Sequence, residues 1–259
     1  MPAHPRTRPA AVAAVVCAAL ALGATACGPT SEDAKPTQAT KPAKPAGPFG
    51  DLTGSQIVDK AFVATKSAKS LTVDVDLKTA DDPTKAYLSL DSQGRCAGTL
   101  TMGVDRTTEL IKADATNVYL RFDEAFLREQ VKGESQEVQD ATVKELRGRW
   151  VKTPTSDPDS EDMLALCDLD GLLSGFEQGA SSIAKGKETT IDGQPALALT
   201  EPGTGGETST VYVATKGTPY VLRIVTTGGE EPGALTFSQY GKPVAAKVPA
   251  AKDVVEVDG

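Results

Sequence analysis

The chain has 259 residues, 27 basic and 35 acidic, and its formal net charge of −8 disfavours nucleic acids and anionic headgroups, because both select basic surfaces. The only histidine is His4, so the rest of the chain offers none for a Ser-His-Asp triad, a Cys–His pair or an imidazole metal site. Composition therefore argues against an enzyme of these classes, and we expect no catalytic residue, no metal ion and no cofactor.

The N-terminal segment has the form of an export signal. Arg6 and Arg8 make a short basic region, and an uncharged apolar run follows over residues 10–22. This run is shorter than the roughly 20 apolar residues that span a membrane, and it ends in small residues. We therefore predict a lipoprotein signal peptide over residues 1–26, cleaved before Cys27.

The stretch Ala24-Thr25-Ala26 before Cys27 resembles the bacterial lipoprotein lipobox, although Ala24 stands where leucine is usual. We expect acylation of Cys27 to anchor the mature protein to the outer face of the cell membrane. Plain secretion is the alternative, because the same small residues suit ordinary signal peptidase. Removal of the signal lowers the number of basic residues to 25 and moves the formal charge to −10. The acyl anchor, rather than basic side chains, would then hold the protein at the membrane.

Beyond the cleavage site, composition separates a tether from a domain. Residues 27–50 hold five prolines among Ser, Thr, Ala and Lys, with no apolar periodicity. Such a segment cannot bury enough surface to offset its chain entropy, so we predict a disordered linker behind the acylated cysteine. Residues 51–259 have a length that fits a single domain.

Two cysteines, Cys96 and Cys167, remain in the predicted domain. An exported compartment permits disulfides, so the simplest expectation is that they pair with each other. Cys96 shares strand parity with apolar Leu100, while Cys167 lies among the leucines of a helical stretch. A bond would then tie a helical layer to the sheet that it covers. Two separately buried thiols are the alternative.

The first half of the domain reads as a helix and a meander. Thr53 and Gln56 have capping-box form, and apolar residues recur at helical spacing, which predicts a helix of about 16 residues ending near Lys69. From Ser70 the period changes to two. Strands are predicted at residues 70–77, 85–91, 96–104, 107–113 and 117–122. The short links between them indicate antiparallel pairing.

The second half alternates helices and strands. Helices are predicted at residues 124–130, 134–146 and 162–176, the last broken near Asp170, with a short strand at 149–152. Further strands are predicted at residues 187–191, 196–200, 208–214, 220–226 and 234–240, before a tail at 244–259. An antiparallel sheet of about ten strands must curl or close. We therefore predict an α+β fold in which a strongly curved half-barrel wraps several helices on its concave face.

Large apolar side chains in these elements can belong to the core or line a cavity. The candidate cavity-lining residues are Leu100, Phe122, Phe126, Trp150, Leu172, Leu173 and Phe176. Burial in plain core is the alternative for each of them, and for Trp150 in particular. Carboxylates over residues 157–162 lack the glycine and the terminal bidentate glutamate of a calcium loop, so we interpret them as a solvated, helix-capping loop.

The order of these features resembles actinobacterial lipoproteins of the LppX/LprG type. The resemblance rests on the lipobox, the first helix, the five-strand meander, Gly148-Arg149-Trp150-Val151-Lys152, the Leu172-Leu173 helix and the ending Phe237-Ser238-Gln239-Tyr240-Gly241-Lys242-Pro243-Val244. It implies a half-open β-barrel similar to the LolA/LolB carriers, an apolar cavity between sheet and helices, and a role in holding or moving lipids or glycolipids. It supplies no catalytic motif, and the Cys96 and Cys167 pair is not part of its pattern.

Three functions stay open on the sequence. A lipid-binding envelope lipoprotein needs a dry apolar cavity with few polar groups. A non-catalytic sensor or protein-interaction module of the envelope would instead show a solid core and an exposed apolar patch. An enzyme would need a converging pair of carboxylates, and the sequence singles out no such pair.

Overall fold

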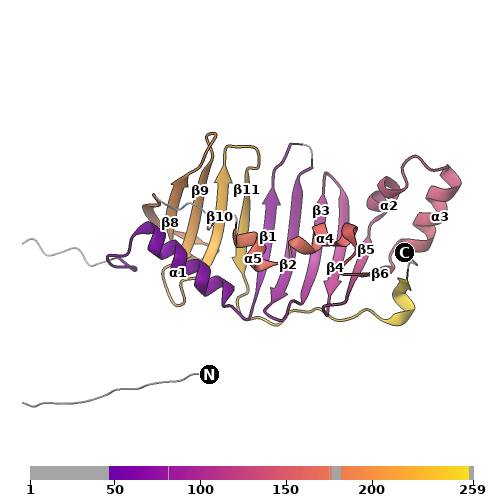
Figure 1. Ribbon diagram of the computed structural model, residues 1–259, viewed down its shortest axis with the longest axis horizontal. Helices are drawn as coiled ribbons and strands as arrows, with labels where there is room; N and C mark the ends of the chain where they lie inside the picture. Colours follow the sequence, from indigo (N-terminus) through magenta and orange to yellow (C-terminus); the bar gives the residue numbers. More distant parts are fainter. Residues whose placement is uncertain (1–46, 81, 175, 177–181, 257–259) are drawn as a thin grey trace, which may run out of the picture. The chain divides into compact units, whose positions relative to one another are not determined.

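One open sheet of twelve strands organises the residues that the computed structural model describes, which are 47–80, 82–174, 176 and 182–256 (Figure 1). The predicted signal peptide, Cys27 and the linker as far as residue 46 lie outside these described residues. Within the described part, no helix is both long enough and apolar enough to cross a bilayer.

The strands follow the predicted alternation closely. Their bounds are β1 (Ser70–Leu77), β2 (Thr84–Asp91), β3 (Cys96–Met102), β4 (Arg106–Lys112), β5 (Asn117–Phe122), β6 (Trp150–Pro154), β7 (Ala184–Ile191), β8 (Gln194–Pro202), β9 (Thr208–Ala214), β10 (Val221–Thr227), β11 (Gly233–Ser238) and β12 (Val254–Glu256). The helices are α1 (Gly54–Lys66), α2 (Glu124–Gln130), α3 (Gln136–Leu146), α4 (Pro158–Ala165), α5 (Leu169–Ser174) and the short 3-10 helix η1 (Ala251–Asp253).

The spatial order of the strands is β12-β6-β5-β4-β3-β2-β1-β11-β10-β9-β8-β7. Two antiparallel meanders, β1 to β5 and β7 to β11, therefore meet where β1 pairs with β11. β6 extends the first meander, and β12 adds the single parallel pair of the described sheet at its edge. The tail after β11 thus returns to the far end of the sheet.

The predicted capping box starts α1. The Thr53 Oγ1 accepts a hydrogen bond from the Gln56 N–H at 3.2 Å, and Gln56 Oε1 accepts one from the Thr53 N–H at 2.9 Å. Both donors would otherwise be orphaned at the helix start. The apolar stripe of α1, which includes Ile57, Ala61 and Phe62, is buried against β9 and β10.

The prediction of a strongly curved half-barrel is wrong, because the sheet is not strongly curled. It also has twelve strands rather than about ten, with β7 and β12 at opposite edges. A sheet of this width can flatten instead of closing. Here α1, α5 and α4 follow one another along one face, where apolar residues of β1 to β5 and β8 to β11 form one core cluster with helix residues without closure of the sheet (Figure 1).

Smaller differences concern element ends. Phe49, which the sequence analysis placed in the linker, packs against the core, so the packed part begins before residue 51. The helical stretch predicted over 162–176 with a break near Asp170 is two helices, α4 and α5, and the break lies earlier, around Cys167. β12 lies in the predicted tail, where a run of three residues is too short to show a period.

Candidate ligand-binding site

The middle of the space between sheet and helices is filled by side chains. Leu100 on β3 is 3 % exposed and Leu173 on α5 is 0 % exposed, and both belong to the main core cluster. Leu172 packs against the same cluster and is half-buried. These three candidate cavity residues therefore lie in core, and the larger pockets lie elsewhere on the sheet.

A pocket of about 530 Å³ lies at the β6 end of the sheet, and we call it the α2–α4 pocket. Its volume falls within the range of roughly 300–1,000 Å³ typical of small-molecule sites. Its lining comprises Met102, Leu120, Phe122, Phe126, Leu127, Gln130, Val131, Thr142, Leu146, Val151, Thr153, Asp157, Ser160, Asp162 and Met163. Strands β3, β5 and β6 form its floor, and α2, α3 and α4 form its walls.

Phe122 and Phe126 are the two predicted cavity residues that the structure brings together in this pocket. Their rings stack with centroids 4.6 Å apart and planes inclined by 19°. Asp123, between them, caps α2 by accepting a hydrogen bond from the Phe126 N–H at 2.8 Å. This local turn fixes the direction in which α2 leaves β5, and so places both rings in one wall.

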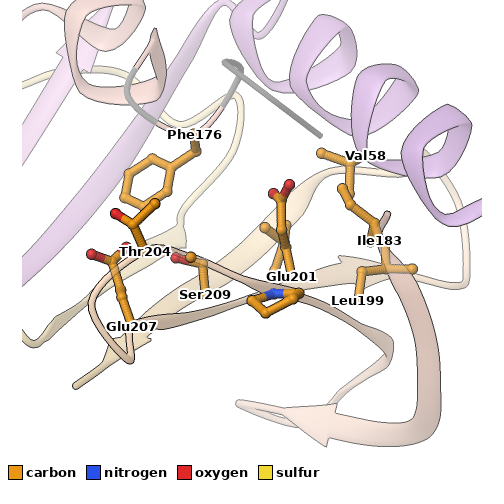
Figure 2. Close-up of a pocket in the computed structure, with 11 residues that line it drawn as sticks. Val58, Phe176, Ile183, Leu199, Glu201, Thr204, Glu207 and Ser209 are labelled. Carbon is orange, nitrogen blue, oxygen red and sulfur yellow. The ribbon is translucent and has the colours of Figure 1, made fainter. Parts of the chain in front are cut away.

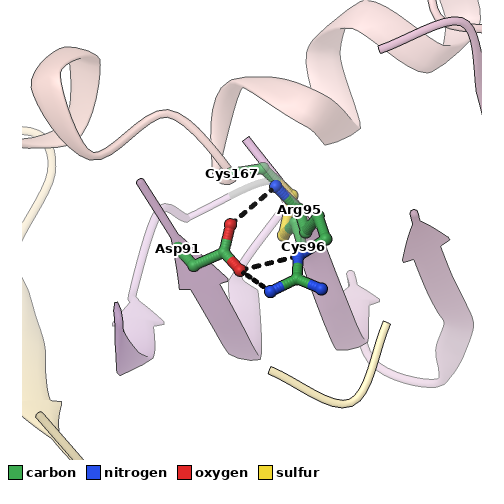
Figure 3. The surroundings of a disulfide bond; sticks show 4 residues. All are labelled: Asp91, Arg95, Cys96 and Cys167. Carbon is green, nitrogen blue, oxygen red and sulfur yellow. Dashed lines mark hydrogen bonds and ion pairs between the residues drawn. A yellow bond between two sulfur atoms is a disulfide. The ribbon is translucent and has the colours of Figure 1, made fainter. Parts of the chain in front are cut away.

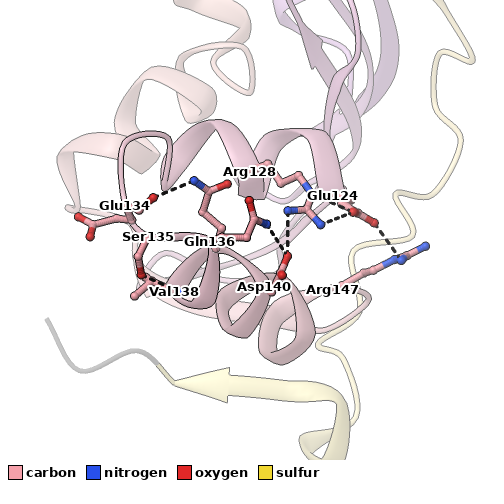
Figure 4. Close-up of polar contacts among 9 residues, drawn as sticks. Glu124, Arg128, Glu134, Ser135, Gln136, Val138, Asp140 and Arg147 are labelled. Atoms are coloured by element: carbon pink, nitrogen blue, oxygen red, sulfur yellow. Dashed lines mark hydrogen bonds and ion pairs between the residues drawn. The ribbon is translucent and has the colours of Figure 1, made fainter.

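Ion pairs hold the α2–α3 hairpin that forms the outer part of this wall (Figure 4). Arg128 contacts Glu124 at 2.9 Å and Asp140 at 3.3 Å, which joins the two helices. Glu124 also contacts Arg147 at 2.9 Å, beyond the end of α3. Hydrogen bonds from its side chain to Glu124 and Asp140 raise the pKa of Arg128, so its charge is fixed. Because these groups are largely exposed, they position the helices more than they stabilise them.

Trp150 does not line the α2–α4 pocket. Val151 and Leu120 are paired in the β5–β6 ladder and face the pocket, so Trp150 lies on the opposite face of the sheet. There the Arg121 guanidinium lies 4.7 Å from the centroid of the Trp150 ring. Arg121 also contacts Glu109 at 2.6 Å. This row across three strands is a packing feature of the outer face.

Phe176 belongs to a second pocket, of about 350 Å³, at the other end of the sheet (Figure 2). We call it the α1 pocket, and its lining comprises Val58, Phe176, Ile183, Leu199, Glu201, Pro202, Gly203, Thr204, Glu207, Ser209 and Val211. It is smaller than the α2–α4 pocket, and polar side chains of the β8–β9 turn form much of it. Three of the candidate cavity residues thus line pockets, Phe122 and Phe126 in the α2–α4 pocket and Phe176 in the α1 pocket.

The structure contains the Cys96–Cys167 disulfide (Figure 3). It joins the start of β3 to the break between α4 and α5, so the helical layer is tied to the sheet face as the sequence analysis expected. Beside it, the Asp91 carboxylate accepts hydrogen bonds from the Arg95 side chain at 2.8 Å and from the Arg95 N–H at 3.1 Å. A disulfide indicates an extracytoplasmic compartment.

Sequence reasoning missed much of the pocket floor, although part of the signal was present. Leu120 shares strand parity with Phe122, so alternation alone places both on one face. Val151 is on β6 and Met163 is on α4. Sequence periodicity does not show how either element is placed against β5. Among the described residues, no group of three His, Cys, Asp or Glu side chains is placed to hold a metal ion.

Comparison with known proteins supports the fold. No protein-family model and no curated protein sequence matches the chain. The crystal structure of LprF from Mycobacterium bovis is similar with a TM-score of 0.51 and 18 % identity, over 76 % of this chain and 97 % of that chain.

Two further solved structures are more distant. The Mycobacterium tuberculosis lipoprotein LppX has a TM-score of 0.48 and 16 % identity, over 75 % of this chain and 98 % of that chain. A domain of an outer membrane lipoprotein-sorting protein of Vibrio parahaemolyticus has a TM-score of 0.26 and 12 % identity, over 73 % of this chain and 79 % of that chain. The chain is thus similar in structure to the mycobacterial lipoproteins LprF and LppX, at low sequence identity.

Proposed function

We propose that this chain is an envelope lipoprotein, anchored through an acylated Cys27, that binds the apolar part of a lipid or glycolipid in the α2–α4 pocket. The observation that carries the proposal is the pocket itself. Its floor and walls include Leu120, Leu127 and Met163, each less than a tenth exposed, beside the stacked Phe122 and Phe126. An apolar ligand that displaces water from such a surface is bound by the hydrophobic effect.

The fold shared with LprF and the resemblance of the sequence to the LppX/LprG type support the same proposal, since that resemblance implies lipid handling. The disulfide supports an extracytoplasmic location. The anchor is argued from sequence alone: the small residues before Cys27 and the Pro-rich stretch after it form a signal and a tether.

Native mass spectrometry of the mature protein, purified from membranes of its own host, tests the binding of lipid. We expect a bound mass that organic solvent extracts as a lipid. Thr142, on α3, is half-buried and lines the pocket, so Thr142→Phe should fill the space and lower lipid occupancy about tenfold. Ala141→Phe is the matched control, because Ala141 precedes it on the same helix and is exposed.

A second control separates the two pockets. Ser209 lines the α1 pocket, so Ser209→Phe should leave occupancy unchanged if the lipid is bound at the α2–α4 pocket. Loss of bound lipid in Ser209→Phe but not in Thr142→Phe would show that the lipid binds in the α1 pocket. A protein that carries no lipid from its host and binds no fluorescent fatty-acid probe would refute the proposal.

The anchor needs a separate test. Cys27→Ala should prevent incorporation of labelled fatty acid and release the protein from the membrane fraction, whereas Cys17→Ala, within the predicted signal peptide, should not. Membrane retention of Cys27→Ala would show that another feature anchors the chain.

One observation favours a second candidate, a non-catalytic sensor or interaction module. The middle of the space between sheet and helices is solid, with Leu88, Leu110 and Leu173 almost wholly buried. The exposed large apolar side chains in the described residues, such as Val63, Val104 and Val138, come from separate elements. A chain purified free of lipid, with no probe binding, would favour this function.

A further inference from the structure

The α2–α4 pocket has an apolar floor and a polar rim, and the rim limits which headgroups it accepts; the inference rests on the proposed function. Gln130 and Asp162 are exposed and Asp157 is half-buried, whereas Leu120 on the floor and Met163 on the α4 wall are buried. An acyl chain on the floor would therefore leave its polar end beside these side chains.

The charge of the rim has one sign. Asp157 and Asp162 are the ionisable residues that line the pocket, and its described lining contains no Lys or Arg. Two nearby cations of α2 and its C-terminal loop are held by carboxylates. Arg128 contacts Glu124 and Asp140, and Lys132 contacts Glu129 at 3.2 Å. Neither lines the α2–α4 pocket.

The start of α4 does not supply a compensating positive site. The Ser160 N–H, in the first turn of α4, donates to Asp157 Oδ1 at 3.3 Å, so a carboxylate of the chain itself already occupies this helix end. The Ser160 hydroxyl also lies 3.5 Å from the same oxygen and is 1 % exposed. A ligand anion brought here would meet two carboxylates of the same sign, which repel it.

We propose that the α2–α4 pocket selects lipids whose headgroup is uncharged and bears hydroxyl groups, and rejects those whose headgroup is anionic. Carboxylate oxygens accept hydrogen bonds from hydroxyl groups, and the Gln130 and Thr142 side chains both donate and accept them. The rim therefore satisfies the polar end of an acylglycerol or glycosyl lipid. It excludes a carboxylate or phosphate by repulsion rather than by shape.

The experiment compares two ligands that share one acyl chain. A monoacylglycerol and the fatty acid of the same chain length compete with a fluorescent uncharged lipid probe on the delipidated mature protein, at neutral pH and low salt. We expect the monoacylglycerol to compete about tenfold better than the fatty acid. Raising the salt concentration should narrow the difference, because the rim is open to solvent.

The variant Asp157→Asn/Asp162→Asn tests whether the rim carboxylates cause the weaker binding of the fatty acid. Asparagine keeps the size and the cap at the start of α4, and it retains a hydrogen-bond acceptor. Fatty-acid affinity should rise about tenfold, while that of the monoacylglycerol stays within about twofold. Glu201→Gln/Glu207→Gln, which removes two carboxylates from the α1 pocket, is the matched control and should change neither affinity.

The outcomes separate the two proposals. If Thr142→Phe abolishes binding of both ligands, but the wild-type protein binds them equally and the double asparagine variant changes nothing, the headgroup inference is overturned and the lipid site stands. If neither ligand displaces the probe, or if Thr142→Phe affects neither, both proposals are overturned.

Discussion

The Thr65 Oγ1 accepts a hydrogen bond of 2.9 Å from the Val221 N–H, and this buried contact joins the last turn of α1 to the first residue of β10. The Tyr240 O–H donates to the Val221 carbonyl at 2.5 Å, and burial raises the pKa of Tyr240. Both backbone groups of Val221 thus depend on side chains from elsewhere in the chain.

Thr65→Val should destabilise the protein by about 1–3 kcal/mol, because it leaves the Val221 N–H buried without an acceptor at nearly constant volume. The free energy of unfolding from urea titration measures the loss. Thr65→Ser keeps the hydroxyl and should recover most of the stability. Equal losses in both variants would mean that the methyl group, not the hydrogen bond, matters.

The same substitution at Thr108 should have the opposite sign. Thr108 on β4 is 0 % exposed, and its Oγ1 has no hydrogen-bond partner among the described residues. Thr108→Val removes a buried, unpaired hydroxyl and should stabilise the protein by about 1 kcal/mol in the same urea titration. A loss of stability would reveal a partner for this hydroxyl, such as an internal water molecule.

Breaking the Cys96–Cys167 disulfide should cost about 4 kcal/mol, since it closes a long loop and restricts the unfolded chain. Guanidinium unfolding of Cys96→Ala/Cys167→Ala and of the reduced wild-type protein, each compared with the disulfide-bonded wild type, measures this loss. Both should show it, since both lack the bond. A cost below about 1 kcal/mol would indicate that core packing already restricts the break between α4 and α5.

Asp91 should make stability depend on pH at the acid end. Burial disfavours its charge, but hydrogen bonds from the Arg95 side chain and from the Arg95 and Gln93 N–H groups outweigh burial and lower its pKa. The folded state therefore holds the carboxylate more strongly than the unfolded state. The resulting stability is fully present above the unfolded pKa, near 3.8, and is lost as pH falls through the lowered folded value.

Asp91→Asn should consequently reduce the free energy of unfolding by about 1–3 kcal/mol at pH 7. The difference from wild type should shrink as pH falls below 3.8, as followed by urea titrations at several pH values. Asp114→Asn is the comparison, because Asp114 makes similar turn contacts to Thr116 and Asn117 but is exposed. A difference that does not vary with pH would assign the effect of Asp91 to packing.

Local signals predicted most of the elements, and the reasons are visible in single residues. The capping box of Thr53 and Gln56 predicted the start of α1, and the alternation of apolar and polar residues from Leu71 onward predicted the first meander. Curvature was not predictable in this way, because twist accumulates over twelve strands and depends on what packs on each face. β12 has three residues, and its strand character comes from pairing with β6.

The candidate site divided along the same line. Phe122 and Phe126 were identified because a short turn capped by Asp123 keeps them together. The position of Trp150 depends on the register between β5 and β6, and a shift of one residue would exchange it with Val151. Local geometry in the sequence can therefore group residues such as Phe122 and Phe126, whereas the face on which Trp150 lies follows from long-range pairing.

The pairing of β1 with β11 has a consequence for how the protein matures. A chain is synthesised from its N-terminus, so β1 to β5 are complete long before their neighbour β11 is made. During that interval β1 presents an unpaired edge, which is a template for wrong pairing with other chains. A chain truncated before Gly233 would therefore aggregate even though its first meander is complete.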